Sequence, residues 1–294
     1  MTSLGDSELI LNPDGSIYHL HLLPEDIAPI IITVGDPMRV PEVSKYFDSI
    51  EIKKSKREFV THTGFYAGKR ITVISTGIGT DNIDIVFNEL DALANIDFKT
   101  RQIKKNKTQL NFIRVGTSGA IQPDIPINSF ILGTSGVGLD NLLHFYHYDL
   151  VNNNVLEQAL RNHFQWEAYH LYPYAVDCDT ELKEIFNDNR IRFGITITNT
   201  GFYGPQGRSL RLTPKVADFH DKLEGFEYQN EYITNLEMET AAMYGLAKLL
   251  GHRAVSLNAI LANRTTGEFS NEGDKTIDAL IQFTLEKIAN SQLV

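Results

Sequence analysis

Short apolar runs that end in glycine recur along this chain, and they constrain its fold more than any other feature. The clearest runs cover residues 28–34, 70–75 and 110–115, and the glycines that follow them are Gly35, Gly77 and Gly116. Runs of this length that are bounded by glycine and rich in β-branched residues are typical of buried strands. Glycine lets the backbone turn tightly and approach a ligand closely. We therefore predict that several strand ends converge on one pocket.

Segments with helical spacing lie between the predicted strands. Apolar residues recur at intervals of three or four within 83–93 and 277–288, and 236–250 has the pattern of a helix that stops at Gly251. Strands and helices alternate without a linker or an internal repeat, which predicts an α/β fold with a parallel or mixed central sheet. We expect a single domain over residues 1–294.

Four other segments have less regular patterns. Residues 1–16 are polar, and we expect them to form a flexible arm. Residues 50–63 have the composition of a strand. The basic stretch 99–107 and the polar stretch 221–231 lack an apolar period, so both are expected to be exposed to solvent.

Arg114 lies near the carboxyl end of the predicted strand 110–115, where open α/β sheets bind their ligands. Thr117 and Ser118 follow it in a glycine-rich turn, and Arg39 follows a similar turn after the first strand. A guanidinium beside hydroxyls and free backbone N–H groups suits a small oxyanion such as phosphate. The alternative is that Arg114 pairs with a structural carboxylate.

Glu237 and Glu239 stand two residues apart at the start of a predicted helix, so they do not share a helix face. One carboxylate can accept two hydrogen bonds from the vicinal hydroxyls of a ribose while the other has a different task. The alternative is that both acids complement the positive amino terminus of the helix.

Gln206 and Arg208 lie in a loop rich in glycine and proline. A glutamine amide offers both a donor and an acceptor, so it can read the edge of a nucleobase. An arginine beside it can stabilise the charge that develops on a departing base. The alternative is an ordinary surface loop.

The chain has 37 acidic and 27 basic residues and a net charge of −10, which disfavours a protein that binds nucleic acid. Its one cysteine, Cys178, cannot form an intramolecular disulfide, and no Cys/His spacing resembles a zinc site. No apolar run reaches the roughly 18 residues of a membrane span, and the amino terminus lacks the pattern of a signal peptide. We expect a soluble, cytoplasmic protein without a membrane or nucleic-acid partner.

Seven motifs occur in the order GDPMR, KREF, STGIG, RVGTSGAIQ, GFYGPQGR, NLEMETAAM and ILANRT. In this order they resemble the type I nucleoside phosphorylase family along nearly the whole chain, and they are most similar to its uridine phosphorylase branch. The resemblance implies a three-layer α/β/α sandwich with a mixed central sheet partly closed into a barrel. It also implies a homo-oligomer, a dimer or a hexamer, whose active sites are shared across a dimer interface.

The resemblance also implies roles for individual residues. The residues at the family's phosphate positions are Gly35, Arg39, Arg57, Arg114 and Thr117. Those at the ribose positions are His19, Glu237, Met238 and Glu239, and those at the base positions are Phe202, Gln206, Arg208 and Arg264. In the family, the residues matching His19 and Arg57 reach the site of the neighbouring subunit. The expected catalytic residues are Arg114, Gln206, Arg208 and Glu239.

The chain departs from the family pattern in several places. The base loop reads GPQGR where the family form is PGQER, and the stretches 99–107 and 221–231 look like insertions, which leaves assembly beyond a dimer open. Potassium can bind at the interface in this branch through positions that match Glu58 and Ile78. The third position is Asn82 here instead of serine, so potassium stays an open possibility. No cofactor is expected, and inorganic phosphate is a co-substrate.

The resemblance implies reversible phosphorolysis of a pyrimidine nucleoside, with uridine and phosphate giving uracil and ribose 1-phosphate. The first alternative is a purine nucleoside phosphorylase, which uses an acid where this chain has Asn263 and Arg264. Arginine is no general acid near neutral pH, because its pKa exceeds ~12. A nucleoside hydrolase has no use for three phosphate-binding arginines. A non-catalytic nucleoside-binding or storage protein is expected to lose phosphate residues, and this chain retains them.

Overall fold

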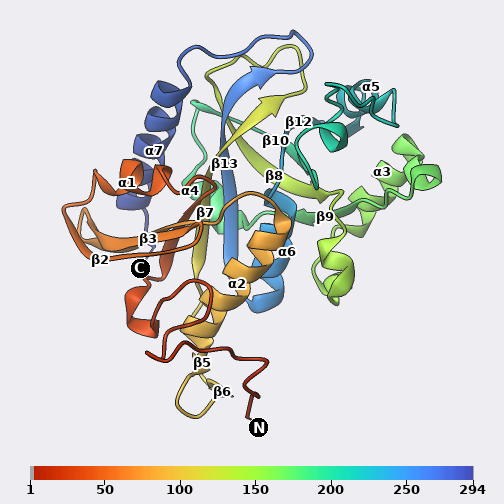
Figure 1. The fold of residues 1–294 in the computed structure, drawn as a ribbon. Helices are drawn as coiled ribbons and strands as arrows, with labels where there is room; N and C mark the ends of the chain where they lie inside the picture. The colour runs from red at the N-terminus through yellow and green to blue at the C-terminus, as the bar shows by residue number, and fades with distance from the viewer. Residues whose placement is uncertain (1–2, 294) are drawn as a thin grey trace.

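The computed structural model describes residues 3–293, and its centre is an eleven-stranded mixed sheet (Figure 1). The strands of this sheet are β1 (Ile30–Val34), β2 (Ser49–Lys56), β3 (Phe59–Tyr66), β4 (Lys69–Ser75), β7 (Asn111–Ala120), β8 (Phe130–Gly138), β9 (Tyr174–Asp177), β10 (Ile191–Thr198), β11 (Glu227–Tyr228), β12 (Glu231–Glu237) and β13 (Arg253–Asn263). A separate hairpin joins β5 (Ile96–Asp97) to β6 (Gln102–Ile103). The single domain over 1–294 stays a prediction, and residues 1, 2 and 294 lie outside the described part of the chain.

Five strands of this sheet close into a barrel. They are ordered β12, β10, β8, β13 and β7, and an antiparallel pairing of β12 with β7 closes the ring. This pairing places Asn235 opposite Ala120 and Leu236 opposite Gly119. The strands β1, β4, β3 and β2 extend the sheet beyond β7. The predicted mixed sheet with partial barrel closure is confirmed.

Helices cover both faces of the sheet and complete the three predicted layers (Figure 1). The helices are α1 (Arg39–Ser44), α2 (Thr80–Asn95), α3 (Asn154–Phe164), α4 (Thr180–Ile185), α5 (Phe219–Glu224), α6 (Thr240–Leu250) and α7 (Gly273–Asn290). Helix α6 packs on β8, β10 and β13 and against α2, whereas α7 contacts β7, β13 and α1. The apolar stripe of α2 is buried as predicted, and Phe87 stacks on Phe112 of β7 with ring centroids 4.2 Å apart.

Two predicted elements divide into smaller ones. Residues 50–63 fall on two antiparallel strands, β2 and β3, joined by a turn at Arg57, whose φ is +55°. The predicted helix 236–250 begins only at Thr240, because the chain up to Glu237 belongs to β12. Within each segment, the apolar residues are compatible both with one continuous element and with the two elements of the structure. Strand pairing decides between these two arrangements.

Two of the three segments that were predicted to be loose or exposed are partly packed. Within residues 3–16, Leu9 is buried, and the Arg101 guanidinium donates hydrogen bonds to the carbonyls of Leu4, Gly5 and Leu9. The described part of the arm is therefore held against the β5–β6 hairpin. Residues 99–107 are mostly exposed, as predicted, and only Arg101 and Lys104 are half-buried. The stretch 221–231 is not an exposed loop, because it contains the end of α5, with Leu223 fully buried, and the turn between β11 and β12.

Across residues 3–293 we find no helix with the length and apolar character needed to cross a bilayer. The cytoplasmic location stays a prediction.

Candidate active site

A cavity of about 830 Å³ opens where β1, β4, β7, β12 and β13 end. Most of the predicted site residues line it. They are Gly35, Arg39, Glu58, Ile78, Asn82, Arg114, Thr117, Phe202, Gln206, Arg208, Glu237, Met238 and Glu239. The carboxyl ends of β1, β4, β7 and β13 meet here because these strands run parallel, and barrel closure adds β12.

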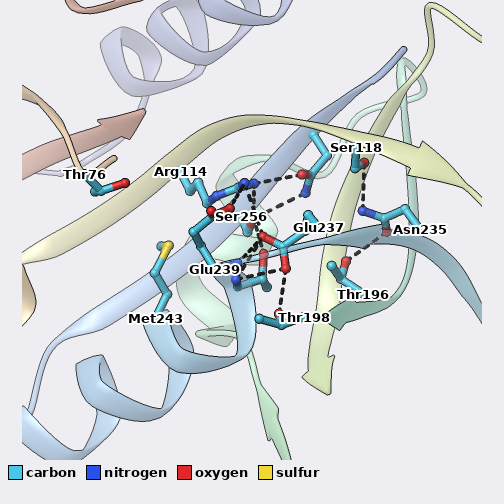
Figure 2. Close-up of polar contacts among 12 residues, drawn as sticks. Thr76, Arg114, Ser118, Thr196, Thr198, Asn235, Glu237, Glu239, Met243 and Ser256 are labelled. Atoms are coloured by element: carbon cyan, nitrogen blue, oxygen red, sulfur yellow. Dashed lines mark hydrogen bonds and ion pairs between the residues drawn. The ribbon is translucent and has the colours of Figure 1, made fainter. Parts of the chain in front are cut away.

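Arg114 contacts two carboxylates and two polar side chains of β13 at the buried end of the cavity (Figure 2). Its Nη2 lies 2.5 Å from Glu239 Oε2 and 3.2 Å from Glu237 Oε2. Its Nη1 donates to Asn258 Oδ1 at 2.8 Å, across the parallel pairing of β7 with β13. The guanidinium folds back over Gly116, where a Cβ would lie only 2.0 Å from Nη1. Glycine at 116 is therefore a packing requirement of Arg114.

Glu237 has a structural task at the junction of β12 and α6. Its carboxylate accepts hydrogen bonds from Thr198 Oγ1 at 2.6 Å and from the backbone N–H of Glu239 at 2.9 Å and of Thr240 at 3.0 Å. These bonds satisfy N–H groups that the first turn of a helix leaves free. The alternative expectation, an acid at a helix amino terminus, is correct for Glu237.

Glu239 accepts fewer hydrogen bonds from the backbone than Glu237. One oxygen binds Arg114, and the other accepts a hydrogen bond from the N–H of Gly79 at 2.9 Å. The carboxylate lines the cavity, so it retains lone pairs for a ligand. The two acids thus have different tasks, as their spacing predicts, although both contact Arg114.

Buried charges balance one another at this end of the cavity. Burial opposes the charge of Arg114, but Glu237 and Glu239 outweigh it and raise its pKa. Burial raises the pKa of the Glu237 carboxyl, and Arg114 only partly offsets this effect. Burial also lowers the pKa of Arg39, and the nearby Arg114 lowers it further. Arg39 makes no ion pair within residues 3–293, so its charge, unlike that of Arg114, is not already paired with a carboxylate.

The base loop, defined as residues 200–208, follows β10 and contains the short helix η5 (Gly204–Gln206). Gln206 is 2% exposed, and its Oε1 accepts a hydrogen bond from Arg208 Nη1. The same Nη1 donates to the Phe202 carbonyl at 2.7 Å, and the guanidinium stacks 3.7 Å from the centroid of the Phe202 ring. Burial and the neighbouring Arg264 lower the pKa of Arg208 to about 10, so Arg208 is still charged at neutral pH.

Three predicted residues do not line this cavity. Arg264 lies next to Gly119, which itself lines the cavity, with Nη2 3.3 Å from His220 Nε2. His19 pairs through Nδ1 with Glu89 Oε1 at 2.6 Å. Arg57 is exposed at the β2–β3 turn, 5.9 Å from the centroid of the Tyr18 ring. His19 and Arg57 therefore lie near each other on a surface outside the cavity of their own chain.

The polar residues that hold these groups in place were not predicted from the sequence. Ser256 and Asn258 support Arg114 from β13, Thr198 supports Glu237 from β10, and His220 contacts Arg264 from α5. A signal was present for two of them. Ser256 and Asn258 alternate on one face of an otherwise apolar strand, and buried polar residues in such a strand require partners.

Comparison with known proteins agrees with this geometry. Residues 29–290 match the family described as the phosphorylase superfamily. The chain therefore belongs to the phosphorylase superfamily, as its motifs predict.

Individual relatives cover most of the chain. A protein of Thermococcus kodakarensis named uridine phosphorylase is 33% identical over 266 residues, which is 89% of this chain and 83% of the relative. A Bacillus cereus protein named purine nucleoside phosphorylase DeoD-type is 28% identical, over 91% of this chain and 97% of the relative. A crystal structure of a Trypanosoma brucei nucleoside phosphorylase, described as showing uridine phosphorylase activity, superposes with a TM-score of 0.87 at 27% identity, over 97% of this chain and 100% of that chain.

Proposed function

We propose that the protein catalyses the reversible phosphorolysis of a pyrimidine nucleoside, and that uridine is the preferred one. The products are uracil and ribose 1-phosphate. The observation that carries the proposal is that one cavity is lined by Arg39, Arg114, Glu239, Gln206 and Arg208. The relatives named uridine phosphorylase support it.

Phosphate binds at the end of the cavity lined by Gly35, Arg39, Arg114 and Thr117. Charge-assisted hydrogen bonds from the two guanidinium groups and the Thr117 hydroxyl orient the dianion for attack on C1′. These residues contribute mainly by orienting the phosphate, because a phosphate held beside C1′ reacts as if it belonged to the same molecule as the nucleoside. No covalent nucleophile from the protein is required.

Charge balance supports a contribution from a second subunit. The ionisable residues that line the cavity are Arg39, Arg114, Arg208, Asp36, Glu58, Glu237 and Glu239, so the acids outnumber the arginines. The residues of one chain therefore do not neutralise the negative charge of a phosphate dianion bound there. Arg57 of a neighbouring subunit supplies the missing positive charge in our proposal, and His19 of that subunit binds the ribose. Both residues lie together on the surface of this chain, as such an exchange requires.

Glu239 is the proposed ribose carboxylate, and Met238 packs beside the sugar. The oxygens of Glu237 already accept hydrogen bonds from Thr198 and from backbone N–H groups. Glu239 accepts only one backbone hydrogen bond, so it is the carboxylate better able to accept from the 2′ and 3′ hydroxyls. Arg114 touches Glu239 and also faces the phosphate end, so it couples the two sub-sites.

Gln206 and Arg208 form the proposed contacts with the base, together with Phe202. The Gln206 Oε1 that accepts from Arg208 has a second lone pair for the N3–H of uracil, and its amide N–H can donate to a carbonyl of the base. Positive charge on Arg208 stabilises the uracil anion as the glycosidic bond breaks, in the manner of an oxyanion hole.

A purine preference is disfavoured by the loop after β13. Asn263 donates to the carbonyls of Gln122 and Ile125 at 2.9 Å, and its Oδ1 accepts from the N–H groups of Thr265 and Thr266. Both polar atoms of the Asn263 side chain are therefore used in hydrogen bonds that hold the loop. The neighbouring Arg264 is no general acid, so neither residue can protonate a purine N7.

A potassium ion between two subunits is a subsidiary proposal. Glu58 and Asn82 both approach Gly77, next to Ile78, at the edge of the cavity. A carboxylate, a backbone carbonyl and an amide oxygen are hard ligands that suit an alkali cation. The ion would order the β2–β3 turn that carries Arg57. Activity in potassium, compared with activity in tetramethylammonium at equal ionic strength, tests this proposal, and equal rates would refute it.

The function is tested by ultraviolet assays on uridine, thymidine, inosine and adenosine, each with and without phosphate. We expect cleavage of uridine that depends on phosphate, with inosine and adenosine much slower. Faster cleavage of either purine nucleoside would overturn the pyrimidine assignment. Cleavage without phosphate would identify a hydrolase instead.

A further inference from the structure

Arg208, in the base loop, and Arg264, near that loop, have different hydrogen-bond partners from Arg114. Arg114 is paired with two carboxylates. Within residues 3–293, neither Arg208 nor Arg264 forms an ion pair with an acid. Arg208 donates instead to a carbonyl and to the neutral amide of Gln206, and Arg264 faces the ring of His220.

His220 lies on α5, within the part of the chain whose function the motifs leave open. Its Nε2 is 3.3 Å from Arg264 Nη2. The ring also packs against the base loop, since a Cβ at Gly207 would lie 2.6 Å from the same nitrogen. His220 thus stands between Arg264 and the loop that carries Gln206 and Arg208.

The chemistry of the contact requires a neutral imidazole. A guanidinium has only donors, so Nε2 accepts from it, and the proton of the neutral ring then lies on Nδ1, which is buried without a hydrogen-bond partner among residues 3–293. Burial of His220 lowers its pKa, and the charges of Arg264 and Arg208 lower it further, whereas the Gln206 backbone and the charge of Asp221 on the same helix raise it. The net lowering of the pKa favours the neutral ring.

We infer that His220 is a positioning residue that holds the Arg264 guanidinium beside the base loop through a neutral acceptor. A carboxylate at this place would orient Arg264 equally well but would cancel its charge. A neutral ring orients the guanidinium and leaves its full charge beside the base loop. This inference rests on the proposed function, in which the base departs as an anion.

The test compares three variants. His220→Leu keeps the bulk and removes the acceptor, whereas His220→Gln keeps an acceptor oxygen near the place of Nε2. His163→Leu is the matched control, because His163 also contacts α5, through the Lys222 carbonyl at 2.8 Å, but does not contact Arg264. Melting temperatures of all three report any loss of folding.

We expect His220→Leu to lower kcat/KM for uridine by roughly 10-fold or more, because a lost hydrogen bond to a charged group has about this effect. The KM for phosphate should stay within a factor of about two, since the phosphate end of the cavity is held by other residues. His220→Gln should recover most of the uridine activity, and His163→Leu should resemble the wild type. The inference would be overturned if the KM for phosphate rose by as large a factor as kcat/KM for uridine fell. It would also be overturned if His163→Leu lowered kcat/KM for uridine as much as His220→Leu does.

Nitrogen NMR of the imidazole rings gives a readout that does not depend on activity. The His220 signals, assigned by their absence in His220→Gln, should show an unprotonated Nε2 and a protonated Nδ1 at pH 7. Replacing the neighbour in Arg264→Met should raise the pKa of His220. A proton on Nε2 at pH 7, or a pKa that does not move, would refute the contact. If these NMR results hold and uridine is not cleaved, then the proposed function fails and the His220–Arg264 contact stands.

Discussion

Glu239 Oε2 lies 2.5 Å from Arg114 Nη2, inside a cavity to which both side chains are open. The contact joins β7 to the start of α6, two elements that are far apart in the sequence. Because Arg114 is assigned to phosphate and Glu239 to ribose, the two sub-sites share one buried ion pair. Substitutions at these two positions should therefore be strongly non-additive.

Arg39 and Arg114 should respond differently to truncation. Arg114→Ala leaves Glu237 and Glu239 buried without their partner, so we expect a loss of about 3–5 kcal/mol in the free energy of unfolding together with at least ~100-fold less activity. Arg39→Ala should raise the KM for phosphate with little change in stability. Denaturant unfolding and phosphate kinetics on both variants check this. A stable Arg114→Ala protein with normal phosphate kinetics would refute the assignment.

Shared active sites should allow complementation between inactive chains. An Arg57→Ala chain lacks the residue given to its neighbour, and a Gln206→Ala chain lacks a residue of its own cavity. Each mixed dimer then has one intact site, so random reassociation should recover about a quarter of wild-type activity. Two preparations of the same variant, mixed in the same way, serve as the control. If verified mixed dimers show no recovery, the cavity is completed within one chain.

The base loop should discriminate strongly between uridine and cytidine. Cytidine has an amino donor in place of the O4 acceptor and has no N3 proton, so donors of the protein face a donor of the base. Sites built on hydrogen bonds reject such analogues by factors of roughly 10⁴ or more. Gln206→Ala should remove much of this preference, and Gln158→Ala, on the exposed face of α3, should not. Competing-substrate assays measure the ratio, and an unchanged ratio in Gln206→Ala would exclude Gln206 from base recognition.

Cys178 should be inert in the folded protein. Burial raises the pKa of its thiol to about 12, so at pH 8 almost none of it is the reactive thiolate. We expect no reaction with a thiol-specific reagent under native conditions, full reaction in denaturant, and normal activity in Cys178→Ser. Rapid modification of the native protein accompanied by inactivation would show that the thiol has a role near the site.

Local patterns were sufficient to predict three of the strands that end at the cavity. The sequences of β1, β4 and β7 have apolar runs and glycine turns that differ clearly from helical spacing. Gly251 ends α6 in the left-handed region with φ of +82°, as predicted. These features depend on residues within a few positions of one another, which a single sequence contains.

Contacts between distant residues could not be predicted in the same way. Residues 231–237 form a strand instead of the first turn of α6 because they pair with β10, and with β7 where barrel closure places Leu236 opposite Gly119. The arm is fixed by Arg101, about ninety residues away from the carbonyls that it binds. Local sequence contains no information on such partners. Local patterns pointed to Arg114, Glu239 and Gln206, whereas His19, Arg57 and Arg264 came only from the resemblance to a family. The residues that support them came only from the structure.

The central claim is tested most directly by following uridine and inorganic phosphate with ³¹P NMR in the presence of the enzyme. The proposed function predicts that the phosphate signal is replaced by that of ribose 1-phosphate, in step with the uracil measured in the same sample. Adding uracil and ribose 1-phosphate should regenerate uridine and phosphate. Release of uracil with free ribose and no change in the phosphate signal, or no reaction at all, would contradict the account.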